Sequence, residues 1–383
     1  MDTVKLYYDN AYTRTFDARV LSCETAKNGF AVVLDRTAFF PEGGGQSADT
    51  GVLGGVRVVD AHEKEGAVIH YTDGPLPVGG TVQGRIDWAE RFRKMQNHSG
   101  EHIVSGLVHA RYGFSNVGFH LGAGGCTIDF DGELSREQLD GIEDAANAAV
   151  WENRTVTARF PGPEELKTLE YRSKLDLTEN VRIVEIEGID RCACCAPHVA
   201  RTGEIGLIKL LDAMRHRGGV RIWLKAGADA AADYRARYTD TAAISGLLNL
   251  PQDQLVPGLE KLLAQRDELK YELTALRRRA VEEQAAALEP TEGNLVLFTE
   301  GEDAERRLLA NAGMEKCGGV CAVFSGQDGA WQFVMGSRTR DMRAFAREIR
   351  EPLSARGGGQ ETMISGRSTA PRETLEAFFR ALT

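Results

Sequence analysis

The pattern of apolar and polar positions first separates a strand-rich region from a helix. Residues 1–86 contain short apolar runs such as "VKLYY" and "FAVVLD", divided by glycine and Asn-Gly turns, which predict a small β-barrel or sandwich. At Asp87 the period becomes helical, with Glu90 three residues after this N-cap and an expected end near Gly113. We therefore expect an N-terminal barrel and a second domain over 87–232 that contains this helix.

A leucine seam follows on a long predicted helix within residues 233–290. Steps of four and three residues separate Leu255, Leu259, Leu262, Leu269, Leu273 and Leu276, and Arg266 lies on the same seam. Two interpretations remain open: a helix packed on its own domain, or a helical hairpin or dimer contact. Strands such as "VCAVFSG" and "WQFVMGS", with helices after them, predict an α/β domain over 291–383. The fold class is thus multidomain α+β, with a long helical linker before the last domain.

Composition narrows the class of protein. The chain has 383 residues, a formal net charge of -10, no apolar run of membrane-spanning length and no leader-like start, so we expect a cytoplasmic protein without a membrane partner. The acidic balance argues against a coat of nucleic acid, although local basic patches are compatible with it. Seven cysteines, three of them within 192–195, favour metal or thiol chemistry over a disulfide framework.

Two pairs of residues have the spacing of metal ligands. His98 and His102 lie one turn apart on the predicted helix, so their imidazoles converge on one face. Cys194 and His198 are also four apart, but Pro197 predicts a loop there. Three nitrogens and one sulfur form a tetrahedral set that favours zinc, one per chain.

The histidine pair has two other interpretations. Histidines on an apolar helix are often hydrogen-bonded core residues. With Glu101 the segment reads H-x-x-E-H, the order of one class of zinc peptidases, but those take a downstream carboxylate rather than a Cys/His pair. We therefore read Glu101 as a helix-surface carboxylate, with a proton carrier as the alternative.

These motifs resemble those of a known family. H-x-x-x-H followed by C-x-x-x-H is the metal signature of the editing domain shared by alanyl- and threonyl-tRNA synthetases and by free-standing alanyl-tRNA editing proteins. "FFPEGGGQSADTG", "VGFHLGAGGCTIDF" and "RHRGGVRIWLKAG" are similar to its glycine-rich motif, its strand pair and its closing basic strand. The last third resembles the DHH-associated domain of the long AlaX form. The resemblance implies a barrel, 1–86, an α/β editing domain with a zinc site, 87–232, a helical linker, 233–290, and a DHH-associated-like domain, 291–383.

The cysteine loop departs from the family pattern. Its commonest form is C-G-G-T-H, whereas this chain has Cys194-Cys195-Ala196-Pro197-His198. The ligand positions are kept, but the threonine of the common loop, whose hydroxyl is able to touch substrate, has no counterpart. Cys192 and Cys195 flank the chosen cysteine, and only the spacing favours Cys194.

The resemblance implies hydrolysis of the ester that joins serine, and with it glycine, to alanine-type tRNA. Four protein ligands fill a tetrahedron, so we favour a zinc that positions the substrate over one that activates water directly. The catalytic residue is not assigned; polar side chains considered for the pocket are Gln46, Glu101, His120, Thr127, Asp129 and Glu42. The alternative function is a noncatalytic zinc-containing module that binds RNA or a protein partner.

Several residues are expected to contact the acceptor end or backbone of tRNA. Gly43, Gly44 and Gly45 lack the Lys-Ser/Thr of a phosphate loop, so they predict either a tight turn or a contact with the acceptor end. In the last third the expected contacts are Arg343, Arg347, Arg356 and a loop of Gly357, Gly358 and Gly359, with Arg350 on the same helical face as the first two. Solvated charge is the plainer interpretation. A homodimer through the long helix and last domain is a further expectation.

Overall fold

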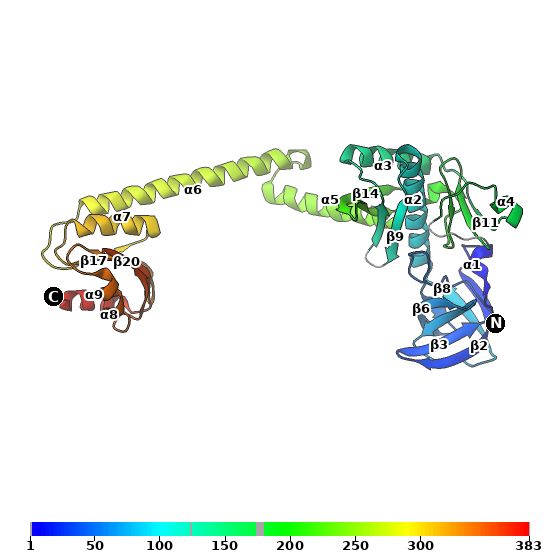
Figure 1. The fold of residues 1–383 in the computed structure, drawn as a ribbon, viewed down its shortest axis with the longest axis horizontal. Coiled ribbons are helices and arrows are strands. Elements are labelled where there is room, and N and C mark those ends of the chain that lie inside the picture. Colours follow the sequence, from blue (N-terminus) through cyan, green and yellow to red (C-terminus); the bar gives the residue numbers. More distant parts are fainter. Residues whose placement is uncertain (1, 123–124, 174–179, 383) are drawn as a thin grey trace. The chain divides into compact units, whose positions relative to one another are not determined.

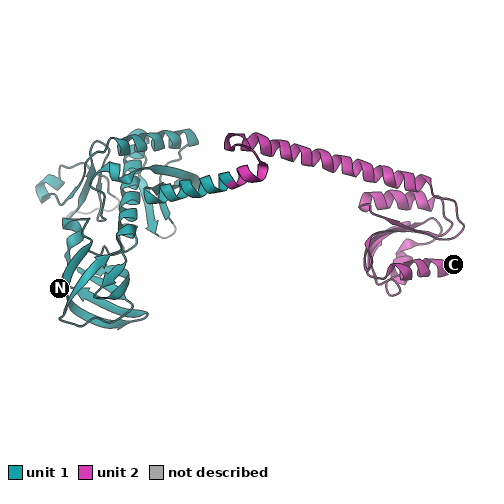
Figure 2. Ribbon diagram, turned by 180° about the vertical axis from the view of Figure 1, so that it is seen from behind, with its two compact units in different colours: residues 1–242 teal, residues 243–383 magenta. Residues whose placement is uncertain are grey.

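The computed structural model describes residues 2–122, 125–173 and 180–382. The chain forms two compact units, residues 1–242 and 243–383 (Figure 2), and the helix α5 (Ala228–Leu248) crosses the boundary between them. Figure 1 shows the fold and labels many of its helices and strands. None of the helices in the described ranges is long and apolar enough to cross a membrane.

A closed six-stranded barrel occupies the start of the first unit. Its strands, in order around the barrel, are β2 (Thr15–Ala26), β3 (Gly29–Leu34), β7 (Ala67–Thr72), β6 (Val56–Lys64), β5 (Gly51–Leu53) and β8 (Thr81–Ile86). Burial alternates along β8, so every second side chain points into the barrel core. The short elements β1 (Val4–Lys5), α1 (Leu6–Asp9) and β4 (Arg36–Thr37) flank the barrel strands in sequence.

The helix α2 (Trp88–Tyr112) follows the barrel, within the bounds that the periodicity predicts. It ends at Gly113, whose left-handed φ of 72° lets its N–H reach the carbonyl of His109. Its middle, from Met95 to Gly106, is buried throughout, including the polar residues. An amphipathic surface helix would show a polar face, so α2 is a core element of this unit.

A four-stranded antiparallel sheet packs with α2 and α3 (Arg136–Trp151) around one hydrophobic core. Its strand order is β14 (Ile208–His216), β15 (Gly219–Ala226), β10 (Gly125–Phe130) and β9 (Asn116–Gly122). A smaller sheet contains β11 (Val156–Arg159), β12 (Ile183–Ile186) and β13 (Asp190–Ala193), with α4 (Pro163–Leu166) after β11. The cysteine loop begins where β13 ends.

The glycine-rich segment joins the barrel to the edge strand β9. Gly43 and Gln46 close a tight turn through two backbone hydrogen bonds of 3.0 Å, and Gln46 then bridges to Leu121. Gly45 has a φ of 84°, and a Cβ there would lie 2.3 Å from the carbonyl oxygen of Phe119. Only glycine fits this approach, so the motif has a structural role at this turn.

A fully buried ion pair holds α2 to the barrel. Arg91 Nε donates to Asp49 Oδ2 at 2.9 Å, and its other nitrogens donate to the carbonyls of Ala11 and Ala38 at 2.9 and 2.6 Å. Asp49 Oδ2 also accepts the N–H of Phe40. These extra hydrogen bonds offset part of the cost of burying the pair.

The second unit contains a long helix and a five-stranded sheet. The helices are α6 (Leu255–Ala286), α7 (Asp303–Met314), α8 (Met342–Glu348) and α9 (Arg372–Ala381). The sheet order is β16 (Leu295–Thr299), β17 (Val320–Gln327), β18 (Ala330–Ser337), β20 (Met363–Ser368) and β19 (Ala355–Gly359). Along α6 the leucine seam is exposed, from 48% at Leu259 to 64% at Leu269.

Two local expectations for this unit are wrong. Gly357, Gly358 and Gly359 do not form a loop, because they belong to β19 at the outer edge of the sheet. Arg350 does not share a face of α8 with Arg343 and Arg347, since the helix ends at Glu348. Glycine is uncommon in strand interiors, so the local sequence favoured a loop that sheet pairing with β20 overrides.

Candidate metal centre and pocket

Four side chains converge at the middle of α2. The ligand atoms of His98, His102, Cys194 and His198 all lie within 4.8 Å of one another. Cys194 Sγ is 3.5 Å from His98 Nε2 and 3.4 Å from His198 Nε2. The structure thus brings together the set expected from the two i, i+4 spacings.

Each histidine of this cluster is oriented through its other ring nitrogen. His98 Nδ1 donates to Gln46 Oε1 at 2.8 Å, and His102 Nδ1 donates to Asp190 Oδ2 at 2.9 Å. His198 Nδ1 lies 3.0 Å from Ser99 Oγ. With Nδ1 engaged in all three rings, Nε2 is left for a metal, which is the usual arrangement around ligating histidines. The donor set therefore fits a tetrahedral zinc ion in number, type and orientation.

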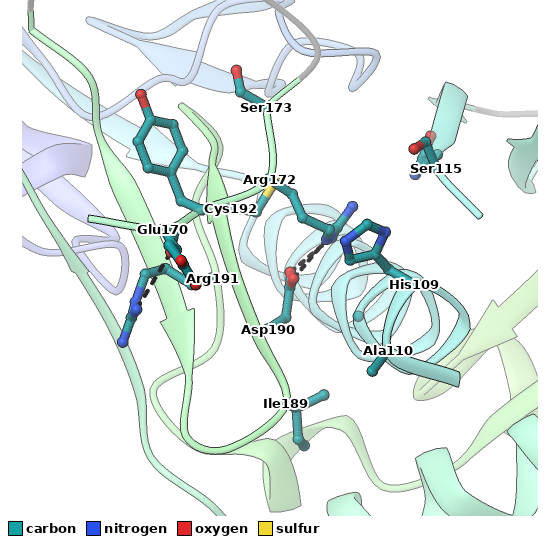
Figure 3. A pocket seen from close by; sticks show the side chains of 13 residues that line it. His109, Ala110, Ser115, Glu170, Arg172, Ser173, Ile189, Asp190, Arg191 and Cys192 are labelled. Carbon is teal, nitrogen blue, oxygen red and sulfur yellow. Dashed lines mark hydrogen bonds and ion pairs between the residues drawn. The ribbon is translucent and has the colours of Figure 1, made fainter. Parts of the chain in front are cut away.

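Asp190, which accepts the hydrogen bond from His102, is itself held by an ion pair. Arg172 binds it with both arms of its guanidinium, at 2.7 and 2.8 Å (Figure 3). Burial raises the pKa of Asp190, but the hydrogen bonds from His102 and Arg172 outweigh it and bring the pKa to about 2. The residue is therefore a carboxylate at neutral pH. Arg172 and Asp190 are 18 residues apart in sequence, so a local sequence pattern does not predict this ion pair.

The three neighbouring thiols have different protonation. Burial raises the pKa of Cys194, yet the neighbouring His98 and His198 imidazoles and hydrogen bonds within the cluster bring its pKa well below the ordinary value. Burial raises the pKa of both Cys192 and Cys195 to about 11. Only a thiolate ligates a metal, so protonation favours Cys194 over Cys192, whose thiol lies in a group with His102 and Asp190.

The cysteine loop is held in place by a buried arginine. Arg182 Nη1 donates to the carbonyls of Cys194 and Ala196 at 3.0 and 2.8 Å. Its guanidinium also lies over the ring of Tyr8, 5.3 Å from the centroid. Pro197 leaves the loop non-helical, as its fixed φ and missing N–H predict.

Glu101 is not a helix-surface carboxylate, so that expectation is wrong. Its exposure is 4%, and Oε1 accepts hydrogen bonds from Ser105 Oγ and Asn116 Nδ2, both at 2.5 Å. Oε2 lies 3.8 Å from His102 Nε2. Periodicity missed this placement because α2 is buried on every side at this level.

The other polar candidates lie apart from the cluster, except Gln46. Phe119 contacts the His98 ring at 4.5 Å, so its strand neighbour His120 points to the opposite face of the sheet. Thr127 pairs with His120 in the register and shares that face, and Asp129 lies two residues further along and binds Arg221. Exposed Glu42 belongs to a separate acidic group with Asp60 and His62.

A pocket of about 500 Å³ opens onto the metal cluster. His98, His102, Cys194 and Glu101 line it together with Gly44 and Gly45. Its other walls include Tyr8, Phe160 and Arg182. A neighbouring cavity of about 520 Å³, shown in Figure 3, shares Asn116, Arg172 and Cys192 with it. The cluster is thus reachable by a small molecule or chain end.

The expected RNA contacts in the second unit are all at the surface. Arg343 and Arg347 are exposed on α8. Arg356 and Gly357 line a cavity of about 980 Å³ with Arg350 and Arg367, and no acidic side chain is among the described residues that line it. Arg367, which the sequence did not single out, stands directly opposite Arg356 in the β19–β20 register.

Comparisons with known proteins agree with this architecture. Residues 181–222 match the family model of the threonyl and alanyl tRNA synthetase second additional domain, and residues 6–90 match that of class II (A) tRNA synthetases. The alanine–tRNA ligase of Halobacterium salinarum is 34% identical over 88% of this chain, which spans only 38% of the ligase.

Two relatives have nearly the same length as this chain. The alanyl-tRNA editing protein Aarsd1 of Rattus norvegicus is 26% identical, over 94% of this chain and 93% of its own. The alanyl-tRNA editing protein AlaX-L of Pyrococcus horikoshii is 27% identical, over 97% and 96%. The resemblance seen in the motifs is therefore confirmed: a segment of the chain matches the second additional domain of threonyl- and alanyl-tRNA synthetases, and the chain is similar to alanyl-tRNA editing proteins over nearly their full length.

Proposed function

We propose that this protein is an aminoacyl-tRNA hydrolase that removes serine, and also glycine, from mischarged alanine-type tRNA. The observation that carries the proposal is the cluster of His98, His102, Cys194 and His198 on a pocket of about 500 Å³, in a chain with the family's editing domain. Water adds to the ester carbonyl carbon, the bond to the ribose oxygen breaks, and the free amino acid and the tRNA hydroxyl are released.

The substrate follows from the limits of size selection. A pocket built for alanine cannot strongly reject serine, which adds one hydroxyl, and glycine is smaller than alanine. A second site that hydrogen-bonds the seryl hydroxyl rejects alanine, because alanine leaves buried polar groups unpaired. Names of relatives such as AlaX-L and Aarsd1 support an editing role on alanyl-type tRNA.

The four-residue cluster would hold one zinc ion per chain. The bound ion would polarise or orient the substrate next to the pocket. Gln46, Asp190 and Ser99 hold the three imidazole rings with Nε2 turned toward the centre. Arg182 keeps the carbonyls of the cysteine loop in place, so the thiolate stays at the same centre.

Zinc content tests the choice of cysteine. Cys194→Ser should remove most of the zinc from the purified protein, because a hydroxyl is a much poorer zinc ligand than a thiolate. Cys192→Ser and Cys195→Ser are matched controls from the same loop and should keep about one zinc per chain, measured by elemental analysis. Zinc loss from Cys195→Ser with retention in Cys194→Ser would contradict the assignment.

The second unit would bind the backbone of tRNA through the arginine cavity. Arg356 and Arg367 stand side by side across two strands, where like charges repel unless an anion lies between them. β19 (Ala355–Gly359) is also the edge strand of the sheet, and its residues from Arg356 to Gly359 are exposed. Arg343 and Arg347 of α8 would extend this surface.

Removing positive charge from this cavity should lower the affinity for tRNA and make that affinity less dependent on the salt concentration. The double variant Arg356→Gln/Arg367→Gln should flatten the slope of log affinity against log salt by about two, one for each phosphate that is no longer neutralised. Arg380→Gln is the matched control, because Arg380 is also exposed but pairs with Glu376. An unchanged slope by fluorescence titration would place RNA binding elsewhere on the chain.

The exposed leucine seam of α6 would pair two copies of the chain. Leu262, Leu269 and Leu276 recur every seven residues, with exposures of 49%, 64% and 61%. A heptad repeat of this kind is buried when two helices form a coiled coil. A homodimer through α6 would therefore cover the apolar face that a single copy leaves in water.

Sedimentation equilibrium tests this assembly. The wild-type protein should have twice the chain mass of 41.9 kDa, and Leu269→Asp should shift it to 41.9 kDa by burying charge in the seam. Tyr271→Asp, on the same helix but off the seam and 79% exposed, should stay dimeric. A monomeric wild-type protein at micromolar concentration contradicts the dimer.

A noncatalytic RNA- or partner-binding module is the second candidate function. The observation that favours it is Ala196-Pro197 in the cysteine loop, where the family's common loop has a threonine hydroxyl. Such a module would keep the zinc site and bind tRNA without releasing the amino acid. The two functions therefore differ in product formation and not in affinity.

A matrix of charged tRNAs separates these functions and tests specificity. Serine should be released from alanine-type tRNA on the order of a hundredfold faster than alanine, because only serine pairs the buried polar groups. The rate for glycine reports how strictly the hydroxyl is required. Faster release of serine from threonine-type tRNA would overturn the alanine assignment, and binding without any release would favour the noncatalytic module.

A further inference from the structure

Glu101 presents one carboxylate oxygen to the pocket. Its Oε1 is occupied by the donors of Ser105 and Asn116, which lock the side chain in one orientation. Its Oε2 accepts no hydrogen bond from the described residues and lies 3.8 Å from His102 Nε2. Since Glu101 is only 4% exposed and lines the pocket, this oxygen is aimed at whatever the pocket holds beside the metal cluster.

The fixed cations around the pocket are already engaged. Arg172 gives both arms to Asp190, and Arg182 donates to two carbonyls of the cysteine loop. The basic group nearest to Glu101 Oε2 is His102 Nε2, at 3.8 Å, which is beyond hydrogen-bonding distance. A buried carboxylate oxygen without a hydrogen-bond donor is costly, so a donor from a ligand, such as an ammonium group, would complete the site.

We propose that Glu101 Oε2 binds the α-ammonium group of the aminoacyl substrate, so that the site accepts esters of free amino acids and rejects N-blocked ones. This inference rests on the proposed function. Every aminoacyl ester carries its ammonium nitrogen two bonds from the carbonyl carbon that water attacks. An ammonium held at Oε2 therefore places that carbon beside the His102 Nε2 side of the metal cluster.

Two other roles for the same oxygen make different predictions. A general base that takes a proton from water serves free and N-blocked esters equally. A carboxylate that supports the metal is needed for zinc content. Only an ammonium contact predicts that removing the Glu101 charge lowers kcat/KM for esters with a free amino group and leaves kcat/KM for N-blocked esters unchanged.

The test uses the full-length zinc-loaded protein with seryl-tRNA and N-acetyl-seryl-tRNA of the alanine type. For the wild-type protein, kcat/KM should be about a hundredfold higher for the free amine, the scale expected when one partner of a buried charge pair is removed. Glu101→Gln should lower kcat/KM for seryl-tRNA by about the same factor and leave N-acetyl-seryl-tRNA nearly unchanged. Zinc content should stay the same, because glutamine keeps the acceptor for Ser105 and Asn116.

A binding measurement separates this inference from the proposed hydrolysis. Calorimetry with 3′-seryl-amino-3′-deoxyadenosine, whose amide resists hydrolysis, and with its N-acetyl form should show the same preference in the wild-type protein and its disappearance in Glu101→Gln. Glu90→Gln is the matched control on the same helix, since Glu90 pairs with Arg93 outside the pocket.

The outcomes are distinct. A wild-type protein that releases serine but treats both amine forms alike overturns the ammonium contact and leaves the hydrolase intact. Equal decreases for both esters in Glu101→Gln, or loss of zinc, also overturn it in favour of a base or a metal support. A wild-type protein that prefers the free-amine analogue without releasing serine overturns the hydrolase and keeps the ammonium contact. If Glu101→Gln does not fold, equal binding of both analogues by the wild-type protein still overturns the ammonium contact.

Discussion

The first unit depends on the burial of a polar helix. Between Arg91 and Ser105, α2 carries nine buried polar or charged side chains, and each would cost free energy if left without a partner. Partners of Arg91, Asn97, His98 and His102 come from three separate parts of the chain: Asp49 and Gln46 from the barrel side, Asp229 and the N–H of Ala226 from the end of the sheet, and Asp190 from the strand before the cysteine loop. The buried polar side chains of α2 therefore find their hydrogen-bond partners only when all three parts of the chain assemble around the helix.

The same constraint builds the metal centre. The hydrogen bonds at Nδ1 of His98 and His102 offset the cost of burying these polar rings. They also leave Nε2 of each ring turned toward the centre of the cluster. Asp190 is in turn neutralised by Arg172, so the negative charge next to His102 does not need the solvent. Hydrogen bonds of this kind hold each imidazole in one orientation, which is what a binding site needs to present its groups in a defined geometry.

Charge is distributed differently in the second unit. There the arginines at 350, 356 and 367 face solvent, where repulsion between like charges is weakened by water and salt. The overall charge of -10 leaves this cavity as a local exception on an acidic protein. A diffuse polyanion such as an RNA backbone suits an exposed cationic surface, whereas the buried pocket suits a single small group with defined geometry.

The sequence by itself determined the features that depend on neighbours within a few residues. The bounds of α2, the i, i+4 spacing of the two ligand pairs, the non-helical loop at Pro197 and the seam of α6 are local, since the helical period and the fixed φ of proline act over one or two turns. Only the tertiary structure decided that Glu101 is buried, that Gln46 and Asp190 orient the histidines, that His120 faces away, and that Gly357 to Gly359 form a strand opposite Arg367. Gln46 is 52 residues from His98, and Asp190 is 88 residues from His102. Contacts over such separations follow from how whole elements pack, and no local period of the chain encodes them.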